Sequence, residues 1–182
     1  MRDLVTPSFL ADQVWTIDLD ALAGMGIRGI ILDLDNTIVN WGDTWVRPEV
    51  SAWLRGVQDR GLRVCVVSNA LRPRRVRVVA QELGIPAVMR AGKPLPSAFR
   101  KGMEALGTDS GTTCAIGDQV FTDILGANWL GLTTILVTPL SPRESPHTRL
   151  IRFLERFLRR RWAGRVGSIT RDGGSARKSS LS

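Results

Sequence analysis

The sequence has two cysteines, a single histidine and no long hydrophobic run. Cys65 and Cys114 each lie in a short apolar run typical of a buried strand, which predicts buried free thiols. The histidine, His147, follows SPRESP and is interpreted as a loop residue, not a metal ligand. No apolar segment approaches the roughly 18 residues that a membrane-spanning helix needs. The N-terminal sequence MRDLVTPSFLADQVW lacks the hydrophobic segment of a signal peptide, so we expect a cytoplasmic protein.

Excess positive charge is absent from most of the chain. Residues 1–146 contain 15 Lys and Arg and 15 Asp and Glu, whereas residues 147–182 contain ten Lys and Arg against Glu155 and Asp172. The net charge of +8 therefore resides in this C-terminal tail, residues 147–182. Nearly all of its basic residues are arginine, which favours a partner that carries phosphate groups. A solvated charged surface without a partner is the alternative.

Strands and helices alternate along most of the chain. Continuous apolar runs predict strands buried on both faces of a parallel sheet, while proline and glycine mark where helices begin and end. The pattern favours one domain with a doubly wound parallel α/β sheet and no internal repeat. We predict a short strand or extended lead-in over 14–18, strands over 28–33, 62–68, 86–91, 112–118 and 133–138, and helices over 18–25, 48–60, 73–83, 96–106 and 120–130.

Several polar residues stand at or just after the predicted strand ends, namely Asp33, Ser68, Asn69, Lys93 and Asp118. Each alone has an ordinary structural explanation, because an aspartate after a strand commonly forms a turn or caps a helix. Ligands of doubly wound sheets, however, bind beyond the carboxyl ends of the strands. The joint placement of these residues at one edge therefore indicates a functional site.

The residue types at this edge suggest phosphate chemistry. Burying carboxylates without partners is costly, so a cation is expected where Asp33, Asp35 and Asp118 meet, and Mg²⁺ prefers carboxylates, water and phosphate oxygens. Lys93 has no role in a carboxylate-only metal site and predicts a further anion, such as a phosphate, to which Ser68 and nearby backbone amides can donate. One aspartate can attack that phosphate, and a second can protonate the leaving oxygen and then activate water.

The chain contains four short motifs in the order DLDNT, VVSNA, AGKPLPSAF and IGDQVFTD. They resemble the four motifs of the haloacid dehalogenase-like (HAD) phosphatases. Longer stretches, such as DLDNTIVNW and GDQVFTDILGANWLGLTTILV, resemble the YqeG-type branch of HAD subfamily IIIA, and the likeness runs over about residues 10–158. The resemblance implies a Rossmann-like fold, Mg²⁺ as cofactor and a phosphorylated substrate. It implies the nucleophile Asp33, the general acid and base Asp35, metal ligation by Asp33, the backbone carbonyl of Asp35 and Asp118, phosphate binding near Ser68, Asn69 and Lys93, and supporting roles for Thr37 and Asp123.

Segment lengths predict a site without a cap domain. The segments between Asp35 and Ser68 and between Ser68 and Asp118 are too short to hold a cap in addition to their predicted helices. A capless site is open and suits a substrate that is large or lies on a surface. Trp41 and Trp45, in the loop beside the acids, either flank this opening or pack against the domain.

The tail begins with TRLIRFLERFLRRRW (148–162), which places apolar residues and arginines on opposite sides of a helix. We predict a basic amphipathic helix over 147–162 that either lies on an anionic lipid surface or packs on the sheet with its arginines solvated. Residues 163–182 are low in complexity and are predicted to be disordered. Residues 1–146 form the predicted phosphatase core with its N-terminal lead-in.

The leading functional hypothesis is a Mg²⁺-dependent phosphomonoesterase that forms an aspartyl-phosphate. Some relatives in the YqeG-type branch act on phosphatidylglycerophosphate, which suggests this lipid and peripheral contact with the inner face of the membrane. The same chemistry on a nucleic-acid end or a soluble phosphate ester is an alternative, because an arginine-rich tail also binds RNA. A phospho-accepting receiver domain is disfavoured, because an acid and base at Asp35 would promote turnover. A basic RNA-associated module leaves the four motifs unexplained.

Overall fold

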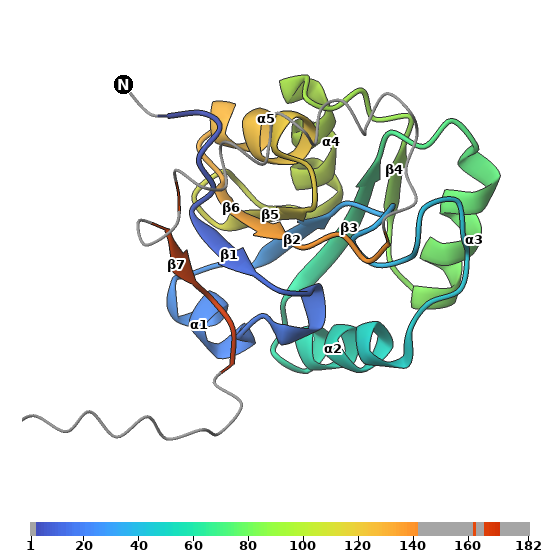
Figure 1. Cartoon of the computed structure of the whole chain (residues 1–182), viewed down its shortest axis with the longest axis horizontal. Coiled ribbons are helices and arrows are strands. Elements are labelled where there is room, and N and C mark those ends of the chain that lie inside the picture. The colour runs from blue at the N-terminus through green and yellow to red at the C-terminus, as the bar shows by residue number, and fades with distance from the viewer. Residues whose placement is uncertain (1–2, 142–161, 163–165, 172–182) are drawn as a thin grey trace, which may run out of the picture.

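A computed structural model describes residues 3–141, 162 and 166–171 of the protein. They form one sheet of seven strands in the order β4-β3-β2-β5-β6-β1-β7, and helices cover both of its faces (Figure 1). All paired strands are parallel, so their carboxyl ends lie at one edge, here called the carboxyl edge. The strands are β1 (Phe9–Ala11), β2 (Gly29–Leu32), β3 (Arg63–Ser68), β4 (Ala87–Met89), β5 (Thr113–Gly117), β6 (Thr133–Val137) and β7 (Gly167–Ser168).

The helices begin and end where proline and glycine allow it. Proline occupies the first turn of α2, α3 and α4, where its missing N–H has no helical partner to lose. Gly84 and Gly107 follow α3 and α4 in the left-handed conformation that closes a helix. The helices are α1 (Leu19–Gly24), α2 (Pro48–Asp59), α3 (Pro73–Leu83), α4 (Pro96–Leu106) and α5 (Leu125–Trp129), with a 3₁₀ turn at Val14–Thr16 and a π-helical turn at Val120–Ile124.

The core lies on both faces of the sheet, because successive side chains of a strand point to opposite faces. Ile30 and Leu32 of β2 pack with apolar residues of α1, α2 and α3, whereas Ile31 packs with α4 and α5 on the other face. This burial explains why the central strands read as unbroken apolar runs, and it confirms the predicted doubly wound α/β class. Among the described residues, no helix combines the length and the apolar character needed to cross a bilayer.

The N-terminal lead-in differs from the prediction. The first strand lies at Phe9–Ala11, and residues Val14–Thr16, where a strand or extended segment was expected, form a 3₁₀ turn instead. The Thr16 hydroxyl donates to the Gln13 carbonyl at 2.8 Å and accepts from the Gln13 N–H at 3.3 Å, which closes this turn. The helix predicted over 120–130 is also interrupted, since its first part is the π-helical turn.

Part of the predicted disordered segment 163–182 is ordered. Gly167 and Ser168 form β7, which pairs with Phe9 and Leu10 of β1, and Ile169 is buried. The backbone N–H of Asp18 donates to the Ile169 carbonyl at 3.0 Å. The ordered core therefore extends beyond the predicted limit at residue 146. Backbone pairing along β1 orders this segment, and such pairing requires no hydrophobic pattern in the sequence.

The helix predicted over 147–162 lies outside the described residues, except for Trp162. The Trp162 side chain is buried among Val120, Ile124 and Leu136, and its indole N–H donates to the Thr6 hydroxyl at 3.0 Å. The last predicted apolar position of this segment thus packs against the α/β domain.

Candidate active site

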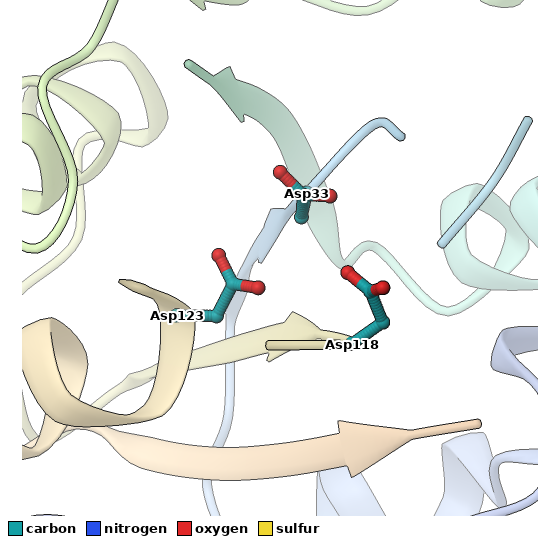
Figure 2. A group of neighbouring side chains, drawn as sticks. All are labelled: Asp33, Asp118 and Asp123. Carbon is teal, nitrogen blue, oxygen red and sulfur yellow. The ribbon is translucent and has the colours of Figure 1, made fainter. Parts of the chain in front are cut away.

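Three buried carboxylates meet at the carboxyl edge of the sheet. Asp33 follows β2 and Asp118 follows β5, and these strands are neighbours, with Leu32 in register with Ile116. Asp123 comes from the π-helical turn, and Figure 2 shows its side chain directed towards those of Asp33 and Asp118. One oxygen from each of the three carboxylates lies within 4.8 Å of the others. A hard divalent cation prefers such oxygen donors, so the three residues fit a metal site.

Asp123 reaches this cluster because the residue that ends β5 is a glycine. A Cβ atom on Gly117 would lie 2.3 Å from Cγ of Asp123, closer than any real contact allows. The Gln119 N–H donates to Oδ2 of Asp123 at 3.1 Å and orients the carboxylate. A π-helical turn inside a helix often occurs at functional sites, and here it carries Asp123 towards the sheet.

Lys93 supplies the positive charge of the cluster. Its Nζ donates to Oδ1 of Asp33 at 2.5 Å and to Oδ1 of Asp123 at 2.7 Å, and its side chain is only 3% exposed. Burial favours the neutral amine, but the Asp123 and Asp33 carboxylates outweigh burial and raise the pKa of Lys93. Burial also raises the pKa of Asp123 to about 6, against the lowering effect of Lys93. One ammonium among three carboxylates leaves excess negative charge, which matches a divalent metal.

The loop that carries Lys93 is held by its backbone. The side chain of Asn69 accepts from the Lys93 N–H and donates to the Lys93 carbonyl, both at 2.8 Å. On the other side, Gly126 of α5 leaves room for this loop, because a Cβ there would lie 2.5 Å from the Pro94 carbonyl oxygen. The Asn69 side chain therefore fixes the loop that carries Lys93, and its predicted role in phosphate binding stays a prediction.

Asp35 lies apart from the three-carboxylate cluster. Its Oδ1 accepts from the Gly42 N–H at 3.0 Å, and its Oδ2 pairs with the guanidinium of Arg75. Arg75 belongs to the first turn of α3 and also donates to the Asp43 carbonyl at 2.8 Å. Burial raises the pKa of Asp35, although the Gly42 N–H and Arg75 lower it. A carboxyl whose pKa is raised by burial holds its proton more readily than an exposed one, which favours a role in proton transfer.

The two predicted hydroxyl residues are buried at the same edge. Ser68 ends β3, the other neighbour of β2, and its Oγ accepts from the Ala70 N–H at 3.1 Å. Thr37 directs its hydroxyl towards Oδ2 of Asp33 at 3.4 Å. Their assigned roles in phosphate binding and loop support stay predictions.

The structure thus brings most of the predicted site residues to one edge, and it adds Arg75 to them. Sequence reasoning missed Arg75 because several arginines stand close together near the start of α3, and no local pattern distinguishes the one that reaches Asp35. Asp123, for which the sequence predicted a supporting role, lies within the carboxylate cluster, and that role stays a prediction.

Comparison with known proteins identifies the family. The family model of the haloacid dehalogenase-like hydrolases matches residues 41–131. The probable phosphatase YqeG of Bacillus subtilis is 33% identical over 156 residues, which are 86% of this chain and 90% of that protein. The phosphatidylglycerophosphate phosphatase 1 of Arabidopsis thaliana is 26% identical over 88% of this chain, which spans only 49% of that longer protein.

A solved structure shares the fold. The cobalt-bound deoxy-D-mannose-octulosonate 8-phosphate phosphatase of Haemophilus influenzae aligns with a TM-score of 0.51 and 18% identity, over 62% of this chain and 69% of that one. Three observations indicate the same family: the order of the motifs, the carboxylates at the strand ends, and the identity to YqeG over most of its length. The protein therefore belongs to the haloacid dehalogenase-like hydrolases and is a phosphatase related to YqeG.

Proposed function

We propose that the protein is a Mg²⁺-dependent phosphomonoesterase that forms an aspartyl-phosphate at Asp33. One observation carries this proposal. The Asp33 carboxylate pairs with the Lys93 ammonium and clusters with the carboxylates of Asp118 and Asp123, while the separately held carboxyl of Asp35 stands two residues along the chain. The proposed nucleophile (Asp33), the neutralising charge (Lys93) and the acid–base group (Asp35) are thus three separate side chains at the carboxyl edge of the sheet.

The donor set determines which residues would hold the metal. Mg²⁺ would be held by Asp33, Asp118 and the backbone carbonyl of Asp35, with Asp123 beside them, and would supply positive charge against the phosphate oxygens. Lys93 orients Asp33 through its 2.5 Å bond and adds a second positive charge near the phosphate. The Ser68 hydroxyl is available to donate to a phosphate oxygen.

Two displacements at phosphorus complete the reaction. An oxygen of Asp33 bonds to phosphorus as the bond to the leaving oxygen breaks, and Asp35 gives its proton to that oxygen. Asp35, now ionised, takes a proton from water, whose oxygen attacks phosphorus while the bond to Asp33 breaks. Phosphate leaves, and both aspartates return to their starting protonation states. Gly42 and Arg75 hold the carboxyl that acts in both steps.

We further propose phosphatidylglycerophosphate as the substrate, hydrolysed by a cytoplasmic protein at the inner face of the membrane. The name of the Arabidopsis relative supports this choice. The connections also support it, because residues 33–47 between β2 and α2 and residues 69–72 between β3 and α3 contain no additional domain that would cover the site. An open site of this kind admits a phosphate that remains part of a surface.

Substrate choice is tested by a hydrolysis screen with Mg²⁺. Phosphatidylglycerophosphate in mixed vesicles, sugar phosphates, nucleotides and 3′-phosphorylated oligonucleotides are compared by kcat/KM. We expect the lipid to be preferred. A preference for the oligonucleotide would instead support the alternative in which the enzyme acts on a nucleic-acid end, and a preference for sugar phosphates would support a soluble ester.

The mechanism is tested by trapping the intermediate. In Asp35→Asn, p-nitrophenyl phosphate should still phosphorylate the enzyme, because p-nitrophenol leaves without a proton, whereas hydrolysis of the aspartyl-phosphate should be slow. Phosphorylated protein should then be visible by intact mass spectrometry. The matched variant Asp33→Asn should form none and should lose several orders of magnitude in turnover. Normal turnover in folded Asp33→Asn would refute the proposed nucleophile.

A further inference from the structure

Exposed apolar side chains gather around the mouth of the active site. Seven large apolar side chains are exposed among the described residues, and four of them lie on the three loops that leave β2, β3 and β4 at the carboxyl edge. Trp41 and Trp45 are 48% and 55% exposed, and Leu71 and Leu95 are 85% and 60% exposed. Isolated exposed apolar residues are ordinary, but a concentration around a functional site indicates an interaction surface.

The same loops expose positive charge. Arg72 precedes α3 and Arg90 follows β4, and both side chains are exposed. The four apolar residues and these two arginines are here called the rim. On the first loop, Asp43 is exposed, but its carboxylate accepts from the backbone N–H groups of Thr44 and Trp45. The rim therefore combines apolar side chains with arginines, the combination that binds anionic lipid surfaces.

The three rim loops are joined to one another and to the site. Arg75 links the first loop to the start of α3, because it donates to the Asp43 carbonyl and pairs with Asp35. Asn69 links the second loop to the third through its two bonds with the Lys93 backbone. The residues that organise the catalytic side chains thus also fix the rim, so a surface that contacts the rim meets the site in a defined orientation.

The leaving group would depart towards this rim. The Gly42 N–H binds Asp35, which would protonate the leaving oxygen, and Gly42 also lines a hollow of about 390 Å³. Trp41 and Asp43 are among the other residues around that hollow. The alcohol part of the substrate therefore faces the loop that carries both rim tryptophans. Tryptophan side chains favour the headgroup level of a bilayer, where one end of the ring is apolar and the other is wet.

We infer that the rim docks the active-site mouth onto an anionic lipid bilayer, so that the phosphate headgroup of a lipid enters the site while its acyl chains stay in the membrane. This inference rests on the proposed phosphatase function and assigns its contact surface. Leu71 and Leu95 favour lipid over nucleic acid, because aliphatic side chains cannot stack on bases as aromatic ones do. The docking surface is on the α/β domain itself, separate from the tail.

The test compares two matched double variants of the full chain. Trp45→Ser with Leu71→Ser removes one tryptophan and one aliphatic residue from the rim. Trp129→Ser with Met25→Ser removes another exposed tryptophan and another exposed aliphatic residue, 62% and 43% exposed, from the end of α5 and just after α1, at the sheet edge opposite the site. Co-sedimentation with phosphatidylglycerol–phosphatidylcholine vesicles should fall at least tenfold for the rim pair and stay unchanged for the control pair.

The contribution of arginine charge to binding and the depth of the rim tryptophan in the bilayer are measured on the same vesicles. Arg72→Ser should weaken binding about fivefold, as expected for one basic residue at an anionic surface, and have no effect on phosphatidylcholine vesicles. Bromine-labelled lipids should quench tryptophan fluorescence less in Trp45→Phe than in the wild type, and as much in Trp129→Phe as in the wild type. These readouts need no turnover.

Activity separates this inference from the proposed function. The rim pair should hydrolyse soluble p-nitrophenyl phosphate normally but hydrolyse vesicle-embedded phosphatidylglycerophosphate slowly. Three outcomes would overturn the docking surface while leaving the phosphatase function intact. One is that the wild type fails to sediment with anionic vesicles, and another is that the two double variants sediment equally well. The third outcome is that the wild type binds RNA in preference to vesicles. If the wild type hydrolyses none of the phosphorylated substrates, the proposed function itself is overturned.

Discussion

Replacing Lys93 with methionine tests the electrostatic design of the site. The Lys93 side chain is 3% exposed and pairs with two carboxylates, Asp33 and Asp123, whose side chains are 10% and 4% exposed. Methionine fills a similar volume but leaves both carboxylates without their buried cation. Breaking a buried ion pair by removing one partner costs about 3–5 kcal/mol, a large part of the roughly 5–15 kcal/mol that stabilises a domain.

Urea unfolding in the presence of a chelator measures this cost. With a slope of about 2 kcal/mol per molar urea, a loss of that size lowers the midpoint by about 1.5–2.5 M. Lys101→Met is the matched control, because Lys101 is exposed on α4, and it should change stability by no more than about 0.5 kcal/mol. A midpoint for Lys93→Met within the error of the wild type would refute the view that Lys93 neutralises the cluster.

A double variant shows whether the lost stability comes from the carboxylates. Asp123→Asn removes one of the two charges that Lys93→Met leaves unpaired, so adding it to Lys93→Met should recover part of the midpoint, whereas alone it should lower the midpoint. Added Mg²⁺ should stabilise Lys93→Met more than the wild type, because the cation replaces part of the missing charge. If the two substitutions are simply additive, repulsion and desolvation at the cluster do not explain the loss.

Two further predictions address the packing around the site. Gly117→Ala should lower the affinity for a divalent metal, measured by calorimetry, while the far-ultraviolet circular dichroism stays native, because the added methyl group displaces Asp123. Unchanged metal affinity would exclude Asp123 from the metal site. Burial raises the pKa of Cys65 to about 11 and that of Cys114 to about 12, so both thiols should be unreactive towards a disulfide reagent at pH 8 until urea unfolds the protein. Rapid labelling of native protein would contradict their burial.

The helices and strands around the site follow from features that are local in sequence. Proline at the first turn and glycine after the last turn define α3 and α4, whose bounds match those predicted. The unbroken apolar runs likewise locate β2, β3 and β5, because both faces of a parallel sheet are buried. Once these strands are known, parallel topology alone brings Asp33, Ser68 and Asp118 to one edge.

Features that depend on distant contacts were not predictable in this way. The π-helical turn widens the helix just where Asp123 must approach Gly117, and its sequence differs in no obvious way from an ordinary first turn. The strand β7 consists of Gly167 and Ser168, which pair through their backbone and carry no hydrophobic pattern. The pairing of β7 depends on β1, far along the chain, and the approach of Asp123 to Gly117 depends on the folded geometry of the turn, neither of which local propensity encodes.

The distribution of charge over the folded domain is likewise not predictable from the sequence. Residues 1–146 are balanced in charge, which by itself suggests that the α/β domain has no preference for an anionic partner. Folding separates the two signs, however. The aspartates at the strand ends turn inward, where Lys93 and a divalent metal can neutralise them, while Arg72 and Arg90 stay exposed at the mouth. The exposed charges of the three loops at the mouth are thus the two arginines and Asp43, a positive balance that the net charge of the domain does not reveal.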